Sequence, residues 1–223
     1  MLMHIHLFAA RCSSLIAAGI LAGSTLFSAA VMAEPSKTPD AFIKSIAEDV
    51  LAEIKADKEI QAGDMSRVNK LVETKILPHV NFVRMTSLAV GRYWARATPD
   101  QQKALQTEFR GLLTRTYAGA LSAAKDAQIQ MRPLRASPED SEVVVRSQVV
   151  QGRGDPIQLD YRMEKSATGW KIYDFNVLGV WLVETYKASF AQEIDKNGLD
   201  GLIKTLAERN KRLEEASSKK QSS

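Results

Sequence analysis

The first half of the chain carries apolar residues at steps of three and four positions, the spacing that puts side chains on one face of a helix. Such stripes cover residues 42–54, 68–76 and 82–90, and the first follows Thr38-Pro39, a helix start signal with proline at the first helical position. A longer stripe, residues 98–121, opens with the capping-box sequence TPDQ. The pattern predicts three shorter helices followed by a long one.

In the second half the period changes to two. Apolar and polar residues alternate in the segments 129–133, 143–150, 157–163 and 170–177, with an irregularity near Asp174 that suggests a bulge. The separators are rich in Gly, Pro and Asp, the residues of tight turns. This pattern predicts four antiparallel strands in a meander, each with one apolar and one wet face.

Two more helical segments, 180–197 and 199–215, follow the strands and meet at a predicted hinge, Asn197-Gly198. The polar tail 217–223 is expected to be disordered. Helices first, then one sheet, then helices again is an α+β order. We therefore predict a curled four-stranded antiparallel sheet wrapped by the N- and C-terminal helices.

The segment DFNVLGVWLVETYKASF, residues 174–190, gathers apolar and aromatic side chains where the last strand meets the next helix. It is either ordinary core that covers the sheet or part of a wall around an apolar ligand. The helix at 98–121 already offers the sheet a wide apolar stripe. A second cover of similar breadth permits an interior larger than the side chains fill, but the periodicity leaves both interpretations open.

Residues 1–33 combine a weakly basic start, an apolar run without acidic residues and small residues at Val31-Met32-Ala33. This is the pattern of a cleaved signal peptide, although the run is also about long enough for an uncleaved membrane anchor. We expect residues 34–216 to form a single domain. Removal of the signal peptide takes away Cys12, the only cysteine, so disulfides and cysteine-bound zinc are excluded from the mature chain.

The mature sequence offers little for catalysis. His79 is its only histidine, and its place directly after Pro78, between two helical stripes, is typical of a cap or loop rather than of a general base. Gly152-Arg153-Gly154 lacks the third glycine of a phosphate-binding loop, and paired carboxylates such as Glu214-Glu215 lie on charged faces. We therefore expect that the protein is not an enzyme and that it binds no metal or cofactor. The net charge of the full chain, +4, is a mild excess and gives no basic stripe for nucleic acid.

Six segments carry a family resemblance, in order and over nearly all of the mature chain. They are ILPHVNFVRMT (76–86), VGRYWARATPDQQKALQTEFRGLLTRTYAGAL (90–121), VVVRSQVV (143–150), PIQLDYRM (156–163), GWKIYDFNVLGVWLVETYKASFAQEI (169–194) and GLDGLIKTLAERN (198–210). Together they resemble the MlaC family of periplasmic phospholipid shuttles, also called toluene-tolerance auxiliary components of an ABC transporter.

The resemblance implies a fold similar to nuclear-transport-factor-like domains, with an internal apolar cavity. It implies a carrier in the periplasm of a Gram-negative bacterium that buries acyl chains and leaves the headgroup in water. The implied partners are an outer-membrane lipoprotein–porin complex and an inner-membrane ABC transporter with its substrate-binding-domain subunit. The implied role is to maintain outer-membrane lipid asymmetry, with phospholipid as cargo and no cofactor.

The candidate residues for contact with lipid tails come from helix faces and inward strand positions. They are Trp94, Phe109, Leu113, Tyr117, Val145, Ile157, Leu159, Tyr161, Ile172, Val177, Trp181, Leu182 and Tyr186. Candidates for the phosphate or for acidic patches on partners are Arg92, Arg96, Arg146 and Arg162, unless they are simply solvated. A headgroup left in water needs few specific contacts, so we expect little headgroup selectivity.

Two other functions remain open from the sequence. A periplasmic chaperone or adaptor would bind polypeptide through an exposed apolar groove. A lipid-hydrolysing enzyme would need a site of unusual composition. Incubation with labelled phospholipid separates the three functions. A carrier binds intact lipid, a chaperone binds none, and a hydrolase releases lysolipid.

Overall fold

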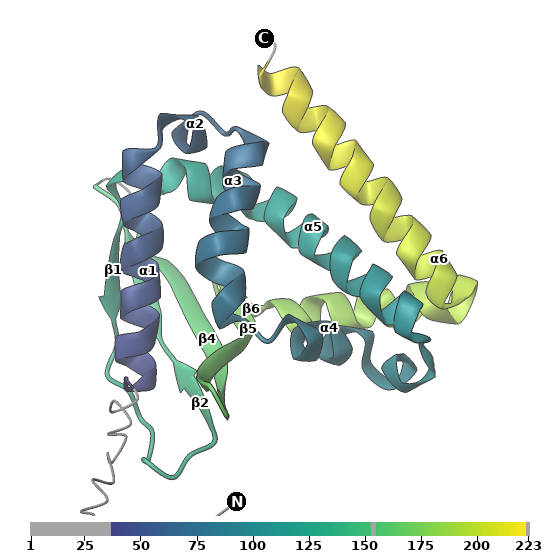
Figure 1. Cartoon of the computed structure of the whole chain (residues 1–223), viewed down its shortest axis with the longest axis horizontal. Coiled ribbons are helices and arrows are strands. Elements are labelled where there is room, and N and C mark those ends of the chain that lie inside the picture. Colours follow the sequence, from purple (N-terminus) through teal and green to yellow (C-terminus); the bar gives the residue numbers. More distant parts are fainter. Residues whose placement is uncertain (1–36, 153–154, 222–223) are drawn as a thin grey trace, which may run out of the picture. The chain divides into compact units, whose positions relative to one another are not determined.

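Helices cover one antiparallel sheet in the structure, a computed structural model that describes residues 37–152 and 155–221 (Figure 1). The α-helices are α1 (Pro39–Ala56), α2 (Lys58–Gln61), α3 (Met65–Leu71), α4 (Phe82–Val90), α5 (Pro99–Ala123) and α6 (Leu182–Gln221). Short helical turns are η1 (Val72–Ile76), η2 (Leu77–His79), η3 (Gly91–Arg96) and η4 (Ala124–Asp126). The strands are β1 (Gln128–Met131), β2 (Glu142–Val145), β3 (Ser147–Val150), β4 (Ile157–Ser166), β5 (Gly169–Val177) and β6 (Val180–Trp181). The predicted α+β class is confirmed, while the predicted signal peptide, residues 1–33, lies outside the described residues.

The sheet has six strands instead of the predicted four. The strands β1, β3, β4, β5 and β6 are antiparallel neighbours in that order, and β2 also pairs with β4. Since β2 and β3 pair with β4 in one unbroken register, they are two parts of the strand predicted at 143–150. The interruption falls at Arg146, next to buried Asp160, whose carboxylate accepts a hydrogen bond from the backbone N–H of Ser147 at 3.2 Å.

The bulge expected near Asp174 is confirmed one residue earlier, at Tyr173. The pairing of β4 with β5 shifts there by one residue. In a regular strand, residues three positions apart point to opposite faces of the sheet. The extra residue brings Ile172 onto the same face as Phe175 and Val177, so all three serve one wall of the interior.

The second difference in strand number arises at the end of β5. Leu178 and Gly179 have φ values of 53° and 88°, and this turn reverses the chain so that β6 pairs with β5. The side-chain oxygen of Asn176 accepts a hydrogen bond from the N–H of Gly179 at 2.9 Å and stabilises the turn. Helix α6 therefore begins at Leu182, two residues later than predicted.

Helix α6 bends at the predicted hinge and continues past its predicted end. Gly198 has φ 72° and ψ −178°, a conformation that interrupts the helix between its two parts. Residues 217–221, predicted to be disordered from their polar composition, continue the helix. The Oγ of Ser217 donates a hydrogen bond to the carbonyl of Leu213, a residue that packs against the core, so the helix is anchored close to this polar end.

Helices α1 and α5 begin where the sequence predicts, but only α5 uses the side-chain cap of its threonine. The capping box of α5 forms as predicted: Thr98 Oγ1 accepts from the N–H of Gln101 at 3.2 Å, and Gln101 Oε1 accepts from the N–H of Thr98 at 3.0 Å. Helix α1 begins at Pro39, but Thr38 makes no side-chain capping bond within the described residues. Proline at the first helical position sets the start of α1 by fixing φ.

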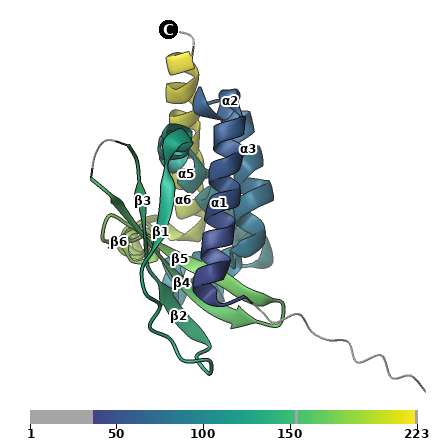
Figure 2. The ribbon, with the colours of Figure 1, turned by 90° about the vertical axis from the view of Figure 1, so that its left-hand side faces the viewer.

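Buried apolar side chains form three separate clusters among the described residues. The first joins α4, α5 and α6 around Phe109; the second joins α1 to the sheet around Ile172; the third joins α1, α2, α3 and α5 around Ile54. Figure 2 shows α1 and α3 side by side on the helical side and the strands on the other. A domain usually has one contiguous core. The division indicates that the space between the clusters is not filled by side chains.

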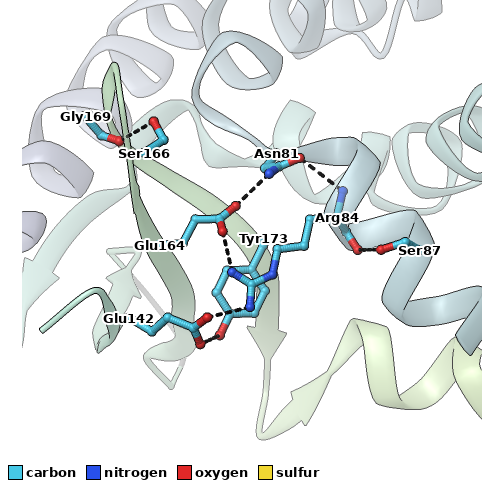
Figure 3. A network of polar contacts seen from close by, with 8 residues as sticks. All are labelled: Asn81, Arg84, Ser87, Glu142, Glu164, Ser166, Gly169 and Tyr173. Atoms are coloured by element: carbon cyan, nitrogen blue, oxygen red, sulfur yellow. Dashed lines mark hydrogen bonds and ion pairs between the residues drawn. The ribbon is translucent and has the colours of Figure 1, made fainter.

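A polar network fastens α4 to the outer side of the sheet (Figure 3). The guanidinium of Arg84 binds Glu142 at 2.6 Å and also Glu164, and it stacks on the ring of Tyr173 at 3.8 Å from the centroid. Asn81, whose side chain caps α4, donates to Glu164 at 2.6 Å. Hydrogen bonds from Arg84 and Tyr173 hold the pKa of Glu142 below its ordinary value.

Replacement of Arg84 by glutamine should lower the free energy of unfolding by about 1–3 kcal/mol, because two carboxylates lose a charged donor. Urea denaturation measures this, with Lys44→Gln as the control. Lys44 pairs with Glu48 on the exposed face of α1 and should change stability by less than about 0.5 kcal/mol. A lowered folded-state pKa adds stability above the unfolded-state pKa, so the effect of Arg84→Gln should be full at pH 7 and shrink below about pH 4. Equal stability of the two variants at pH 7 would contradict the role of the network.

Candidate ligand-binding site, an apolar cavity

A cavity of about 310 Å³ lies where the three clusters meet. Its wall includes Met85 from the first cluster, Tyr161 from the second and Ile54 from the third. The contributing elements are α1, η1, η2, α4, α5, η4, the sheet strands β1, β3, β4 and β5, and the first residue of α6. Most of these can be followed in Figure 2, where the helices stand against the strands.

The wall is almost entirely apolar. The exceptions are Arg110, Thr114, Tyr117, Gln151 and Tyr161. Burial raises the pKa of both Tyr117 and Tyr161, so both phenols are neutral at neutral pH. Arg110 is the one charged side chain on the described wall. Such a surface favours hydrocarbon and offers polar ligands little compensation for lost water.

The periodicity of each element explains why its apolar side chains meet here. Helix α1 presents a stripe at helical spacing, formed by Ile43, Ile46, Ala47, Val50, Leu51 and Ile54. Strand β4 presents every second residue, Ile157, Leu159 and Tyr161. The bulge in β5 adds its three apolar residues to the same face, as described above.

The structure brings more than half of the predicted tail-contact residues together on this wall. They are Leu113, Tyr117, Ile157, Leu159, Tyr161, Ile172, Val177 and Leu182. They come from α5, β4, β5 and the start of α6, elements that the sequence places on both sides of the interior. Their contact with a ligand stays a prediction, but their common location is a property of the fold.

The other five candidates lie elsewhere in the structure. Phe109 and Tyr186 pack ring against ring, with centroids 5.0 Å apart, and Trp94 packs against the same α4–α5–α6 cluster. Val145 is buried in the cluster between α1 and the sheet. The guanidinium carbon of Arg162 lies over the ring of Trp181, 4.0 Å from the ring centroid. None of these five residues is on the wall of the cavity, and their contact with a ligand stays a prediction.

None of the four predicted arginines lines the cavity. Arg92 and Arg96 are exposed on η3, where Arg92 lies 3.6 Å from Asp195. Arg146 is exposed at the break between β2 and β3. Arg162 forms ion pairs with Asp174 at 3.0 Å and Glu184 at 2.9 Å, so its charge is balanced by two carboxylates of the protein.

The sequence interpretation missed the contribution of α1 and of the η1–η2 turns. The stripe on α1 is visible in the sequence, but periodicity identifies an apolar face without identifying what it faces. The prediction also missed Arg110, which the stripe of α5 places on a charged, solvated face. Its neighbour one turn later, Thr114, is buried, a signal that this part of α5 is not simply a solvated surface.

The one histidine among the described residues is not on the wall of this site. His79 lies in η2 and packs edge to face on Phe42, with ring centroids 5.4 Å apart. Burial and the neighbouring Lys171 lower its pKa, so it is neutral at pH 7. Residues 37–152 and 155–221 contain no group of three or more His, Cys, Asp or Glu that could hold a metal ion. No helix within those ranges has the length and hydropathy needed to cross a membrane.

A curled antiparallel sheet closed by helices around an apolar cavity defines a class of protein that encloses an apolar ligand. Residues 44–208 match the family described as MlaC protein, and the chain belongs to the MlaC family. It is 24% identical over 169 residues to the intermembrane phospholipid transport system binding protein MlaC of Haemophilus influenzae, covering 74% of this chain and 79% of that protein.

Two further relatives extend the comparison. The toluene tolerance protein ttg2D of Pseudomonas putida is 24% identical over 172 residues, covering 77% of this chain and 79% of that protein. The phospholipid-binding protein from Ralstonia solanacearum, solved in complex with a phospholipid, is 47% identical with a TM-score of 0.77. That similarity covers 79% of this chain and 99% of the solved chain. The family and fold suggested by the sequence are thereby confirmed.

A cavity-filling substitution tests whether the interior is hollow. In ligand-free protein, Ala47→Phe on the cavity wall should leave the free energy of unfolding unchanged or raise it by about 0.5–2 kcal/mol, because the ring enters existing space. A filled interior would instead lose about 1–3 kcal/mol through overpacking. Urea denaturation measures the difference, with Ala95→Phe on the exposed surface of η3 as the control. A loss of 2 kcal/mol relative to this control would contradict the cavity.

Proposed function

We propose that the protein is a phospholipid carrier that holds acyl chains in the apolar cavity and leaves the headgroup near water. One observation carries the proposal: an apolar cavity lies inside a fold that is 47% identical to a protein solved with a bound phospholipid. The wall of the cavity suits hydrocarbon in composition, and its one charge, Arg110, leaves the rest free of groups that would favour a polar ligand.

The energetics of lipid transfer explain why a carrier has this design. A diacyl phospholipid has roughly 30 methylene groups, and each contributes about 0.8 kcal/mol when it is buried. Exposure of both chains to water would cost on the order of 20 kcal/mol, which thermal motion does not supply. A carrier must therefore offer the chains an apolar environment nearly equal to the bilayer. It needs no catalytic group.

The size of the cavity bears on how much of the lipid it holds. A water-sized group occupies about 30 Å³, so 310 Å³ accommodates on the order of ten groups of that size. A methylene is similar in size to water. The cavity in this conformation thus suits most of one acyl chain, and full enclosure of two chains requires the wall elements to move apart.

Membership of the MlaC family supports a cellular setting for this carrier. We propose that the protein is exported to the periplasm and exchanges lipid with an inner-membrane ABC transporter complex and an outer-membrane lipoprotein–porin complex. Through that exchange it would maintain the lipid asymmetry of the outer membrane. The relative from Haemophilus influenzae, named as the binding protein of an intermembrane phospholipid transport system, supports this setting.

The composition of the wall weighs against both rival functions. A polypeptide ligand carries backbone amides that need hydrogen-bond partners when buried, and this wall offers very few. A hydrolase needs a nucleophile with an adjacent base, and the cavity wall includes no serine, cysteine or histidine among the described residues. Intact lipid is the ligand that the composition of the wall favours.

Mass spectrometry of the ligand extracted from natively purified protein tests the proposal directly. We expect intact phospholipids with varied headgroups, bound in a fixed ratio to the protein. Incubation with labelled phospholipid should return the label in unmodified form. Recovery of lysolipid would favour the hydrolase, and protein that neither carries nor takes up lipid would contradict a carrier.

Placement of a charge in the wall should remove the ligand. Leu182 lines the cavity and is 6% exposed, whereas Val180, two residues earlier, is 52% exposed. We expect Leu182→Glu to lower bound phospholipid at least tenfold, because a buried carboxylate disfavours hydrocarbon beside it. Val180→Glu should retain the wild-type amount. Circular dichroism confirms that both variants are folded, and wild-type lipid content in folded Leu182→Glu would contradict the assignment.

A further inference from the structure

A second, polar pocket of about 180 Å³ adjoins the apolar cavity, between the α3–η1 segment and α5. Its wall is formed by Asn69, Val72, Glu73, Thr107, Arg110, Gly111, Thr114 and Arg115. Three of these residues, Val72, Arg110 and Thr114, also line the apolar cavity. The two spaces therefore lie next to each other, and these three residues form the boundary between them.

Arg110 is the charged residue at this boundary. Its side chain is half-buried, and it forms no hydrogen bond or ion pair with any residue in the described part of the chain. Other partly buried arginines, such as Arg84 and Arg162, are each paired with two carboxylates. An arginine at an apolar boundary places its methylenes on the apolar side and its guanidinium on the polar side. Five N–H donors of Arg110 are thus available to a ligand in the polar pocket.

The remaining polar groups of the pocket are arranged around that guanidinium. Thr114 is 8% exposed, and its hydroxyl makes no hydrogen bond within residues 37–152 and 155–221. Arg115 is held by Glu214 at 3.2 Å, so its charge is already partly balanced. Glu73 is the one carboxylate on the pocket wall; it is exposed and forms no ion pair within the described ranges. Arg110 is the one positive charge on the described pocket wall without a partner in the protein, and Glu73, which is exposed, is the one negative charge.

Gly111 leaves room beside Arg115 on the wall of the polar pocket. A Cβ at this position would lie 2.8 Å from the Nη1 of Arg115 and 3.1 Å from the Nδ2 of Asn210. The missing side chain lets Arg115 lie across α5 and face the pocket. The space, about 180 Å³, holds roughly six water-sized groups, enough for a phosphate.

We propose that this polar pocket binds the phosphate group of the carried phospholipid, with Arg110 as its main contact and Thr114 as a second donor. The proposal rests on the proposed function and adds the site at which the headgroup is held. Guanidinium groups suit phosphate oxygens because two parallel N–H donors match their spacing. Phosphate is common to all phospholipids, so this site recognises the class without distinguishing among headgroups. The substituent beyond the phosphate would extend past exposed Thr107 and Glu73 into water.

The test compares a phospholipid with a lipid that lacks only the phosphate. Lipid-free protein is incubated with vesicles that contain phosphatidylethanolamine and diacylglycerol with the same acyl chains, and native mass spectrometry measures the ratio of the two bound lipids. Arg110→Gln removes the charge, and Arg110→Lys keeps the charge without the paired donors. The control is Lys103→Gln, an exposed residue two turns earlier on the same helix that lies outside both pockets.

We expect wild type and Lys103→Gln to share one preference for phospholipid, Arg110→Gln to lose about tenfold of it, and Arg110→Lys to lie between them. Phosphatidylglycerol in place of phosphatidylethanolamine should give the same result. An unchanged ratio in folded Arg110→Gln overturns the phosphate site and leaves the carrier function standing. Wild-type protein that takes up neither lipid overturns both.

A second arm separates the lipid phosphate from free phosphate. Inorganic phosphate at millimolar concentration is added to lipid-free protein, and the melting temperature is recorded. We expect inorganic phosphate to raise the melting temperature of wild type no more than that of Lys103→Gln. Free phosphate lacks the buried acyl chains that hold the lipid phosphate in the pocket. If inorganic phosphate stabilises wild type but not Arg110→Gln, and the lipid ratio does not depend on Arg110, the pocket is a free-anion site and the lipid assignment is overturned.

Discussion

A hollow interior lacks the packing contacts that usually hold helices against a sheet, so the elements around the cavity must be held by contacts on their other sides. Asp174 shows how this is done at the start of α6. One carboxylate oxygen accepts from the N–H of Val183 at 3.0 Å, and the other accepts from Arg162 at 3.0 Å. Burial raises the pKa of Asp174 although these bonds oppose it. The strand thus caps the helix and fixes Leu182 on the cavity wall.

The same principle operates at the other edges of the cavity. Arg84 ties α4 to the sheet from outside, through the network of Figure 3. Between α5 and α6, the side chain of buried Asn210 donates to the backbone carbonyl of Glu108 at 2.9 Å, beside Gly111. These contacts all face away from the cavity. The protein can therefore keep its inner wall chemically uniform, which suits a ligand recognised by its hydrocarbon.

The order and type of most elements could be predicted from the sequence because each follows from local spacing, as in the capping box at Thr98 and the alternation along β4. The breaks could not. The interruption at Arg146 lies beside Asp160 on a neighbouring strand, and β6 depends on the unusual backbone of Leu178. Both features depend on conformation or contacts that periodicity does not reveal. They changed the number of strands but not the class of fold.

The sequence predicts which strand residues point to the inner face of the sheet, and the candidate site could be predicted only where that face lines the cavity. Leu159 and Tyr161 satisfy this rule because β4 crosses the cavity, whereas Val145 on β2 faces side chains of α1 and the sheet. Phe109 and Tyr186 also lie off this wall, and their aromatic rings pack against each other. The hydrophobicity of a residue predicts burial, but only the packing of whole elements decides whether burial is against protein or against space.

A carrier must also release its cargo, and this limits how strongly Arg110 should act. The cavity and the bilayer both shield the chains from water, so the hydrocarbon term of about 20 kcal/mol nearly cancels between them. The difference that remains depends on small terms. A half-exposed guanidinium exchanges water for phosphate at a net gain of about 1.5–3 kcal/mol. At the proposed phosphate site, that gain would be enough to orient the lipid and small enough for the lipid to return to a membrane.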